Sequence, residues 1–172
     1  MKPQVGIIMG SDSDLEVMKD AAKILSDLGI DNEILILSTH RAPEETAKYA
    51  KSARTRGLKV LIAGAGGAAA LPGSLAAQST LPVIGVPVET KTLGGVDSLY
   101  SIVSMPPGVP VATVGINSAK NAGLLAAQII GVHDPKVSQK IADYKQKMKK
   151  EVLEKNSKLQ KIGPEKYLEK AK

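Results

Sequence analysis

A histidine and an arginine, His40 and Arg41, stand side by side directly after a short apolar run. An imidazole titrates near neutral pH and can therefore both give and take a proton. A guanidinium can hold a phosphate group through two parallel hydrogen bonds. The pair points to proton transfer on a phosphorylated ligand. A buried structural histidine and an arginine in a surface ion pair are the alternatives that the pattern leaves open.

A second polar segment, residues 10–14 (GSDSD), stands just before a helical pattern. Ser11 and Ser13 offer hydroxyl groups, and the free N–H groups at a helix start attract anions. The segment therefore predicts a cradle for a phosphate or a sugar. The alternative is helix capping, in which Ser13 or Asp14 accepts a backbone hydrogen bond. Both hold if Asp14 caps the helix while Ser11 faces the ligand.

Glycine and alanine dominate residues 64–73 (GAGGAAALPG). Because glycine has no side chain, the backbone here can approach a ligand closely, and its N–H groups could bind a carboxylate or CO2-like oxygens. Close helix packing at a subunit contact explains the same composition equally well. The segment is thus a candidate binding loop or a candidate packing surface.

A parallel β-sheet is the element that could position these three segments. Amphipathic helical patterns at residues 15–28, 44–56, 71–78, 96–103 and 119–130 alternate with short apolar runs at residues 5–9, 34–37, 60–63, 83–86 and 111–116. Nearly continuous apolar runs are typical of strands buried on both faces. The alternation predicts an α/β fold with helices on both faces of the sheet. Ligands of such sheets bind at the carboxyl ends of the strands, where the polar segments lie.

The net charge of +6 is concentrated in the C-terminal part of the chain, residues 134–172. Up to residue 133, 11 basic residues balance 11 acidic ones, whereas 12 lysines accompany 6 acids beyond it. This part has no arginine and only two aromatic residues, so base stacking and bidentate base readout are not favoured. We expect residues 1–133 to form the α/β unit. Residues 134–172 should add to the same domain a lysine-rich helix, from about 135 to 156, that contacts a neighbouring subunit.

Composition also argues against several classes of protein. The chain has no cysteine, which excludes disulfides and thiolate chemistry, and its two histidines make a His-rich metal site unexpected. No apolar run reaches the length of a membrane span, and the N-terminus lacks the features of a secretory signal. We therefore expect a cytoplasmic protein with no metal, no membrane partner and no nucleic-acid partner.

Together, the loop motifs resemble those of one family, the class I N5-carboxyaminoimidazole ribonucleotide mutases of de novo purine biosynthesis. In family order over about residues 4 to 150, the motifs are MGSDSD (9–14), STHR (38–41), AGAGGAA (63–69), LPG (71–73), GVP (85–87), GVDSL (95–99), MPPGVPVA (105–112) and NAGLLAAQ (121–128). The resemblance implies a flavodoxin-like three-layer sandwich and a homo-octamer with active sites at subunit boundaries. It also implies an isomerase that needs no cofactor.

The same resemblance implies a role for each candidate residue. His40 would be the general acid and base while a carbamate is lost as CO2, retained, and added to ring carbon C4 of the ribonucleotide. Ser11 and Arg41 would hold the phosphate and Asp14 the ribose hydroxyls, while residues 64–69 would line the CO2 pocket. The expected substrate-binding residues are Ser11, Ser13, Asp14, Ser38, Arg41, Gly66, Gly67 and Ala70.

The chain departs from the class I pattern at three positions. Ala70 stands where the family pattern GGAAHLPG has a histidine, Thr39 where alanine is usual and Ser74 where methionine is usual. Ala70 takes a polar ring away from the expected CO2 pocket. An engineered variant, a natural variant that keeps activity and one with altered activity are all compatible with this change.

Three other functions remain as alternatives to the mutase, and one of them, a nucleic-acid binder acting through the lysine-rich C-terminal part, would require strongly salt-dependent association with DNA or RNA. A class II relative carboxylates aminoimidazole ribonucleotide directly with CO2, but the intact glycine-rich run at 64–69 and the LPG after it favour class I. The third alternative, prompted by Ala70, is a protein that binds a ribonucleotide without turning it over.

Overall fold

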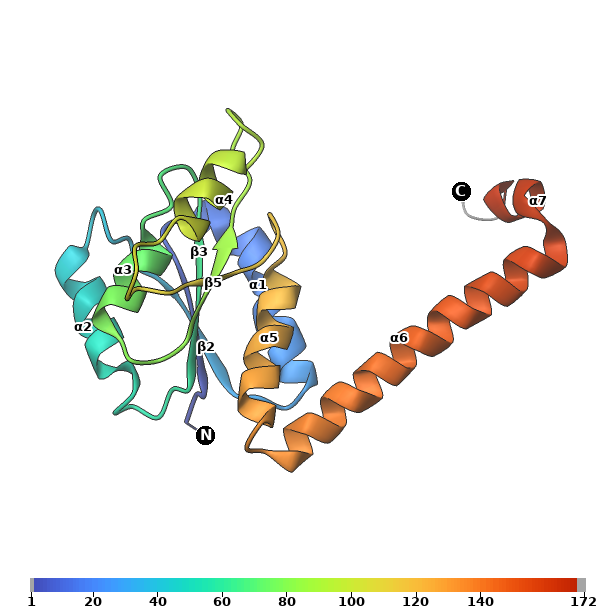
Figure 1. Cartoon of the computed structure of the whole chain (residues 1–172), viewed down its shortest axis with the longest axis horizontal. Coiled ribbons are helices and arrows are strands. Elements are labelled where there is room, and N and C mark those ends of the chain that lie inside the picture. Colours follow the sequence, from blue (N-terminus) through green and yellow to red (C-terminus); the bar gives the residue numbers. More distant parts are fainter. Residues whose placement is uncertain (1, 170–172) are drawn as a thin grey trace.

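A five-stranded parallel sheet forms the centre of the protein, whose computed structural model describes residues 2–169 (Figure 1). The strands are β1 (Val5–Met9), β2 (Asn32–Ile36), β3 (Val60–Ala65), β4 (Val83–Pro87) and β5 (Ala112–Thr113). Their order is β2-β1-β3-β4-β5, and each neighbouring pair is parallel. This order is that of the flavodoxin-like fold, so the predicted fold class is confirmed.

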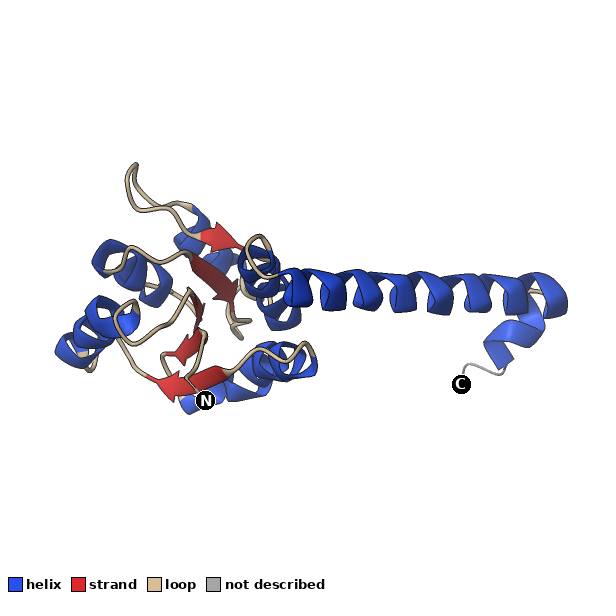
Figure 2. Ribbon diagram, turned by 90° about the horizontal axis from the view of Figure 1, so that it is seen from below, coloured by secondary structure: helices blue, strands red, loops and turns tan. Residues whose placement is uncertain are grey.

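Helices cover both faces of the sheet (Figure 2). In chain order they are the 3-10 turn η1 (Asp12–Asp14), α1 (Leu15–Asp27), α2 (Pro43–Ala53), α3 (Leu71–Gln78), α4 (Val96–Val103), α5 (Ala119–Gly131), α6 (Pro135–Ile162) and α7 (Pro164–Glu169). Side chains alternate between the two faces along each strand, so Ile7 packs with α1 and α5 while Ile8 packs with α2 and α3. Two apolar layers thereby fix the sheet against its helices.

The edge strands differ from their predicted bounds. β2 begins two residues earlier than predicted and is only partly buried, and β5 has two residues instead of six. Backbone bonds from Val114 to Gly85 and from Asn117 to Pro87 continue past β5, but Asn117 has a left-handed backbone with φ of 55°. The apolar run at 111–116 therefore becomes mostly a loop that packs against the sheet rather than a strand within it.

Helix α6 extends far beyond the α/β unit (Figure 1). Asp134 caps its start by accepting hydrogen bonds from the N–H groups of Lys136 and Val137, and the helix runs six residues past the predicted end. Only Val137 and Ile141 are buried. Contact with a neighbouring subunit stays a prediction. Of the predicted segments 1–133 and 134–172, residue 1 and residues 170–172 lie outside the described residues. Within residues 2–169, no helix is long and apolar enough to cross a membrane.

A buried tyrosine on α2, Tyr49, links this helix to the edge strand β2. The Tyr49 hydroxyl donates to Glu33 Oε1 at 2.7 Å, and Arg56 pairs with the other carboxylate oxygen while lying over the tyrosine ring. A Cβ atom on Gly6 would lie 2.2 Å from the Tyr49 hydroxyl oxygen, so only glycine leaves room for it on β1. Burial, followed by the hydrogen bond and charge of Glu33, raises the pKa of the Tyr49 phenol well above its usual value of 10.

We expect Tyr49→Phe to lower the free energy of unfolding by about 1 kcal/mol at pH 7, because it removes a buried hydrogen bond. Above pH 10 the unfolded wild type releases the Tyr49 proton while the folded state retains it, so wild-type stability falls as pH rises. The difference between the two proteins should therefore shrink in denaturant titrations above pH 10. Tyr100→Phe, at an exposed tyrosine, is the control. A difference that stays constant across this range would contradict the prediction.

Candidate active site

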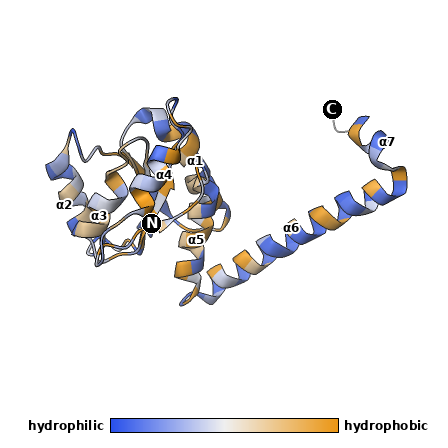
Figure 3. Ribbon diagram, turned by 45° about the horizontal axis from the view of Figure 1, so that its top comes forward, coloured by the Kyte–Doolittle hydropathy of each residue, from blue (hydrophilic) through white to orange (hydrophobic). Residues whose placement is uncertain are grey.

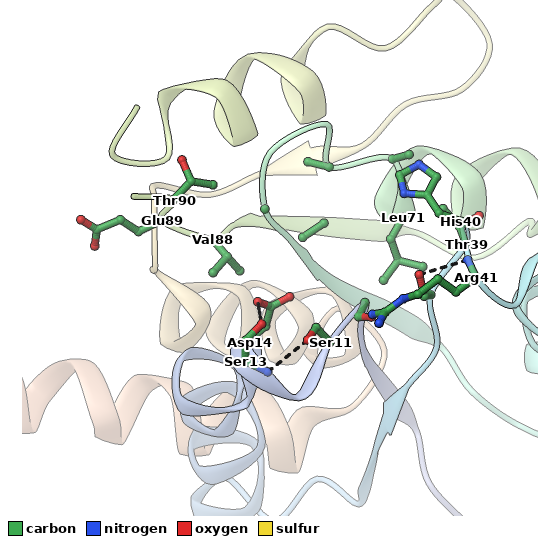
Figure 4. A pocket seen from close by; sticks show the side chains of 16 residues that line it. Ser11, Ser13, Asp14, Thr39, His40, Arg41, Leu71, Val88, Glu89 and Thr90 are labelled. Atoms are coloured by element: carbon green, nitrogen blue, oxygen red, sulfur yellow. Dashed lines mark hydrogen bonds between the residues drawn. The ribbon is translucent and has the colours of Figure 1, made fainter. Parts of the chain in front are cut away.

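A cavity of about 490 Å³ lies at the carboxyl edge of the sheet (Figure 4). Loops that follow β1, β2, β3 and β4 form its walls, as expected for ligand sites of parallel sheets. Its volume lies in the range of small-molecule sites. The lining residues are Gly10, Ser11, Ser13, Asp14, Ser38, Thr39, His40, Arg41, Ala65, Gly66, Ala69, Ala70, Leu71, Val88, Glu89 and Thr90.

Eight of the nine residues singled out from the sequence line this one cavity, although they come from three separate loops. The exception is Gly67, whose N–H group donates to the Ser98 hydroxyl at 2.9 Å. Its backbone is left-handed, with φ of 66°, which favours glycine. Gly67 therefore shapes the loop that carries Gly66 rather than lining the cavity itself.

The loop after β1 places its hydroxyls and carboxylate differently from the capping alternative. Ser11, not Ser13 or Asp14, caps the first turn by accepting from the Ser13 N–H group at 3.3 Å. Asp14 precedes α1 but makes no side-chain capping bond, so the capping alternative is wrong for Asp14. The short 3-10 turn explains the difference, since it moves the cap to its own first residue. The Asp14 carboxylate lines the cavity instead.

Asp14 is half-buried in the cavity wall, and its surroundings alter its acidity. Burial raises the pKa of the Asp14 carboxyl above its usual 3.8. A hydrogen bond from the Ser13 hydroxyl, 3.0 Å long, opposes this effect, and the nearby charge of Asp12 adds to it. An anion held partly out of water gains most from a ligand that donates hydrogen bonds to it.

The loop after β2 brings His40 and Arg41 to the opposite wall. The Arg41 guanidinium donates to the Gly10 carbonyl at the end of β1 and extends toward Ser11, as Figure 4 shows. The His40 ring points away from the Arg41 guanidinium in Figure 4, and His40 and Leu71 both line the cavity. His40 is exposed, so the alternative of a buried structural histidine is wrong. Arg41 forms no carboxylate ion pair within residues 2–169.

Sequence reasoning did not single out Ser98, the residue that holds the glycine loop in place. Ser98 lies on α4 and is fully buried. Its hydroxyl accepts from the Gly67 N–H group and donates to the Val88 carbonyl at 2.7 Å, which joins the loops after β3 and β4. The Ser101 hydroxyl lies 3.2 Å from the Gly67 carbonyl. The motif GVDSL contains Ser98, but only the packing of α4 reveals its partners.

Sequence reasoning also missed the cavity wall formed by residues 88–90. Glu89 and Asn117 exchange two hydrogen bonds, with the Asn117 amide donating to the carboxylate at 3.0 Å and accepting from the Glu89 N–H group at 2.9 Å. The Thr90 hydroxyl donates to the Asp97 carboxylate at 2.9 Å. These contacts join residues far apart in the sequence, so no local pattern signals them. Within residues 2–169, no cluster of three His, Cys, Asp or Glu side chains could hold a metal ion.

The fold and the cavity together define a flavodoxin-like α/β protein with a cavity of small-molecule size at the carboxyl edge of its sheet. Asp14, the adjacent His40 and Arg41, the glycine loop and Glu89 line that cavity from the loops after β1, β2, β3 and β4 respectively. Comparison with known sequences identifies the family. The chain belongs to the AIR carboxylase family, which it matches over residues 4–151.

Named relatives fall into two groups. An N5-carboxyaminoimidazole ribonucleotide mutase of Thermotoga maritima is 62% identical over 166 residues, which cover 96% of this chain and 97% of that protein. A phosphoribosylaminoimidazole carboxylase of Candida glabrata is 56% identical over 168 residues, which cover 98% of this chain but 30% of the relative. The chain therefore has the extent of the mutases and corresponds to one part of the longer fungal carboxylases.

A solved structure has the same fold. The crystal structure of Treponema denticola PurE superposes with a TM-score of 0.84 at 32% sequence identity, covering 91% of this chain and 98% of that chain. The match thus extends over nine-tenths of this chain and nearly all of the Treponema chain.

Proposed function

We propose that this protein is an isomerase that converts N5-carboxyaminoimidazole ribonucleotide into 4-carboxy-5-aminoimidazole ribonucleotide in de novo purine biosynthesis. The 62% identity to a mutase of equal extent supports the reaction. The observation that carries the proposal is the meeting of Ser11, His40 and Gly66 in one cavity. The rearrangement needs a group that binds the substrate phosphate, a group that carries protons and a pocket of small residues that retains CO2.

In the reaction, the bond between the exocyclic nitrogen and the carboxylate carbon breaks. Its electron pair stays on the nitrogen, which takes up a proton, and CO2 is retained in the cavity. Ring carbon C4 then forms a bond to the CO2 carbon, and the proton on C4 leaves. Because one proton is delivered and one removed, a single group can serve both steps. His40 is our candidate for that general acid and base, a contribution of about 10²–10⁴-fold.

The remaining lining residues divide between the two ends of the substrate. Ser11 and Arg41 would bind the phosphate, assisted by Ser13 and Ser38, because hydroxyl and guanidinium groups are its usual donors. Asp14 would accept hydrogen bonds from the ribose hydroxyls. This role agrees with its place in the wall and with the absence of a helix-capping bond.

The loop of Gly66 and Gly67 would enclose CO2 and the carboxylate, since small side chains and backbone leave a dry, closely fitting space. Ala70 lines the same part of the cavity directly before α3, with no side-chain capping bond to the helix. A methyl group there offers no polar contact to a carboxylate. The departure at Ala70 therefore supports a second candidate, a ribonucleotide-binding protein of reduced turnover.

The C-terminal part supports a proposal about assembly. Helix α6 exposes Met148, Val152 and Leu153 along its outer half, where apolar positions interrupt a hydrophilic surface (Figure 3). We assign residues 134–172 to subunit contact within a homo-octamer, and the protein to the cytoplasm. We further propose that the chain binds a small-molecule ribonucleotide and further copies of itself, and that its activity needs no cofactor, nucleic acid or membrane.

Isotope tracing tests this proposal against direct carboxylation. The protein is supplied with N5-carboxyaminoimidazole ribonucleotide that carries ¹³C in the carbamate, in the presence of excess unlabelled bicarbonate. We expect the product carboxylate to keep most of the label, because CO2 is retained between the two steps. Formation of unlabelled product, or of product from aminoimidazole ribonucleotide only when CO2 is added, would assign the class II reaction. Tight binding without product would support the second candidate.

A further inference from the structure

The loop that carries His40, residues 38–42, is short and joins β2 to α2. Within residues 2–169, the His40 ring has no hydrogen bond to any protein group. Two contacts brace the loop internally: the N–H group of Arg41 donates to the Ser38 hydroxyl at 3.3 Å, and that of Ala42 donates to the Ser38 carbonyl at 2.8 Å. The position of the ring therefore depends on how the loop as a whole is attached to its surroundings.

Side-chain hydrogen bonds attach this loop on both sides of His40. The residue after it, Arg41, donates to the Gly10 carbonyl at the end of β1. The residue before it, Thr39, donates from Oγ1 to Ser74 Oγ on α3 at 2.7 Å. The second bond spans 35 positions of sequence and is partly buried, so it is shielded from competing water.

Ser74 connects the loop to α3, the helix that begins at Leu71 of the cavity wall. The Ser74 N–H group donates to the Ala70 carbonyl at 3.0 Å, so Ser74 lies one helical turn after Ala70, which lines the cavity. Leu71, in the first turn of α3, lines the same cavity as His40 (Figure 4). The Thr39–Ser74 bond consequently fixes the spacing between the imidazole loop and the wall proposed to enclose CO2.

We propose that Thr39 and Ser74 are positioning residues that act together through this bond to hold the His40 ring in the orientation that proton transfer requires. The inference rests on the proposed function of the cavity. Proton transfer is sensitive to placement, since a displacement of about 1 Å can cost about 10²-fold in rate. Thr39 and Ser74 are also two of the three departures from the class I pattern, and they contact each other, as expected if the chain uses them as one unit.

A double-mutant cycle tests the proposal. Thr39→Val keeps the shape of the side chain and removes the hydroxyl, and Ser74→Ala removes the other partner. A net hydrogen bond of about 0.5–1.5 kcal/mol corresponds to roughly a 2- to 13-fold loss of kcat in each single variant. The double variant should lose no more kcat than either single variant, and KM should change little. Thr39→Ser keeps the hydroxyl and should therefore retain the wild-type kcat. Losses that multiply in the double variant, or unchanged kcat in both singles, would overturn the pairing.

Matched controls separate positioning from a general loss of stability. Thr55 donates to the Ser52 carbonyl and Ser52 to the Tyr49 carbonyl at the end of α2, outside the cavity. Thr55→Val and Ser52→Ala remove the same chemical groups there. We expect the controls to leave kcat unchanged while all variants stay folded at the assay temperature. If Thr55→Val lowers kcat as much as Thr39→Val does, the positioning role is wrong.

Nuclear magnetic resonance of ¹³C-labelled histidine gives a readout that needs no turnover. The chain has two histidines, and His133 at the junction of α5 and α6 serves as an internal reference. Thr39→Val should shift or broaden the His40 ring signals and leave those of His133 unchanged. If the wild type has no activity, the proposed function fails, but these signals still decide the positioning inference. An unchanged His40 signal in Thr39→Val would reject it.

Discussion

Replacing His40 with asparagine is expected to abolish turnover, with kcat falling by at least about 10²-fold. Asparagine keeps a polar side chain of similar reach but cannot carry a proton between the exocyclic nitrogen and C4. The variant should still bind the ribonucleotide, because Ser11 and Asp14, candidate phosphate and ribose residues, lie on the loop after β1, and the neighbouring Arg41 side chain is left in place. Steady-state kinetics, calorimetric titration with substrate and a thermal unfolding scan measure the three quantities.

The second histidine provides a matched control for this substitution. His133 is exposed at the junction between α5 and α6, and it does not line the cavity. We expect His133→Asn to retain wild-type kcat and KM. A His40→Asn variant with wild-type turnover would remove His40 from the mechanism, and a variant that neither binds nor assembles would make its role structural.

The sheet could be predicted from the sequence because its central strands lie in a uniform environment. β1, β3 and β4 are buried on both faces, and each appears as an unbroken apolar run. β2 and β5 lie at the edges, where one neighbour is missing and burial is partial. Apolar content alone cannot tell an edge strand from a packed loop, which explains why the errors of boundary occur there.

Site residues that lie on a loop directly after a strand could be predicted from the sequence. Site residues that tertiary packing brings together could not. Ser11, Asp14, His40 and Arg41 follow directly from strand ends, which topology brings to one edge of the sheet. The bond between Thr39 and Ser74 joins distant positions through two ordinary hydroxyls, and neither residue type announces a partner. The same holds for Ser98, Glu89 and Asn117, whose contacts depend on how α4 and the loop after β5 lie against the sheet.

Replacing Arg41 with alanine should weaken substrate binding far more than it slows chemistry. Charge-assisted hydrogen bonds are worth about 1.5–3 kcal/mol, which corresponds to a rise in Kd and KM of roughly 13- to 160-fold. A phosphate contact is made in the ground state and the transition state alike, so its loss changes KM rather than kcat. A smaller fall in kcat is expected because the bond to the Gly10 carbonyl is lost as well.

The ligand itself supplies the sharpest control for Arg41. Aminoimidazole ribonucleoside lacks the phosphate, so Arg41→Ala should leave its affinity unchanged while weakening that of the ribonucleotide. Arg54 donates to the Thr80 hydroxyl at 3.2 Å outside the cavity, and Arg54→Ala should alter neither affinity. The loss at Arg41 should also decrease at high ionic strength, where salt screens the wild-type contact. An effect confined to kcat, or equal weakening of nucleoside and nucleotide, would place the phosphate elsewhere in the cavity.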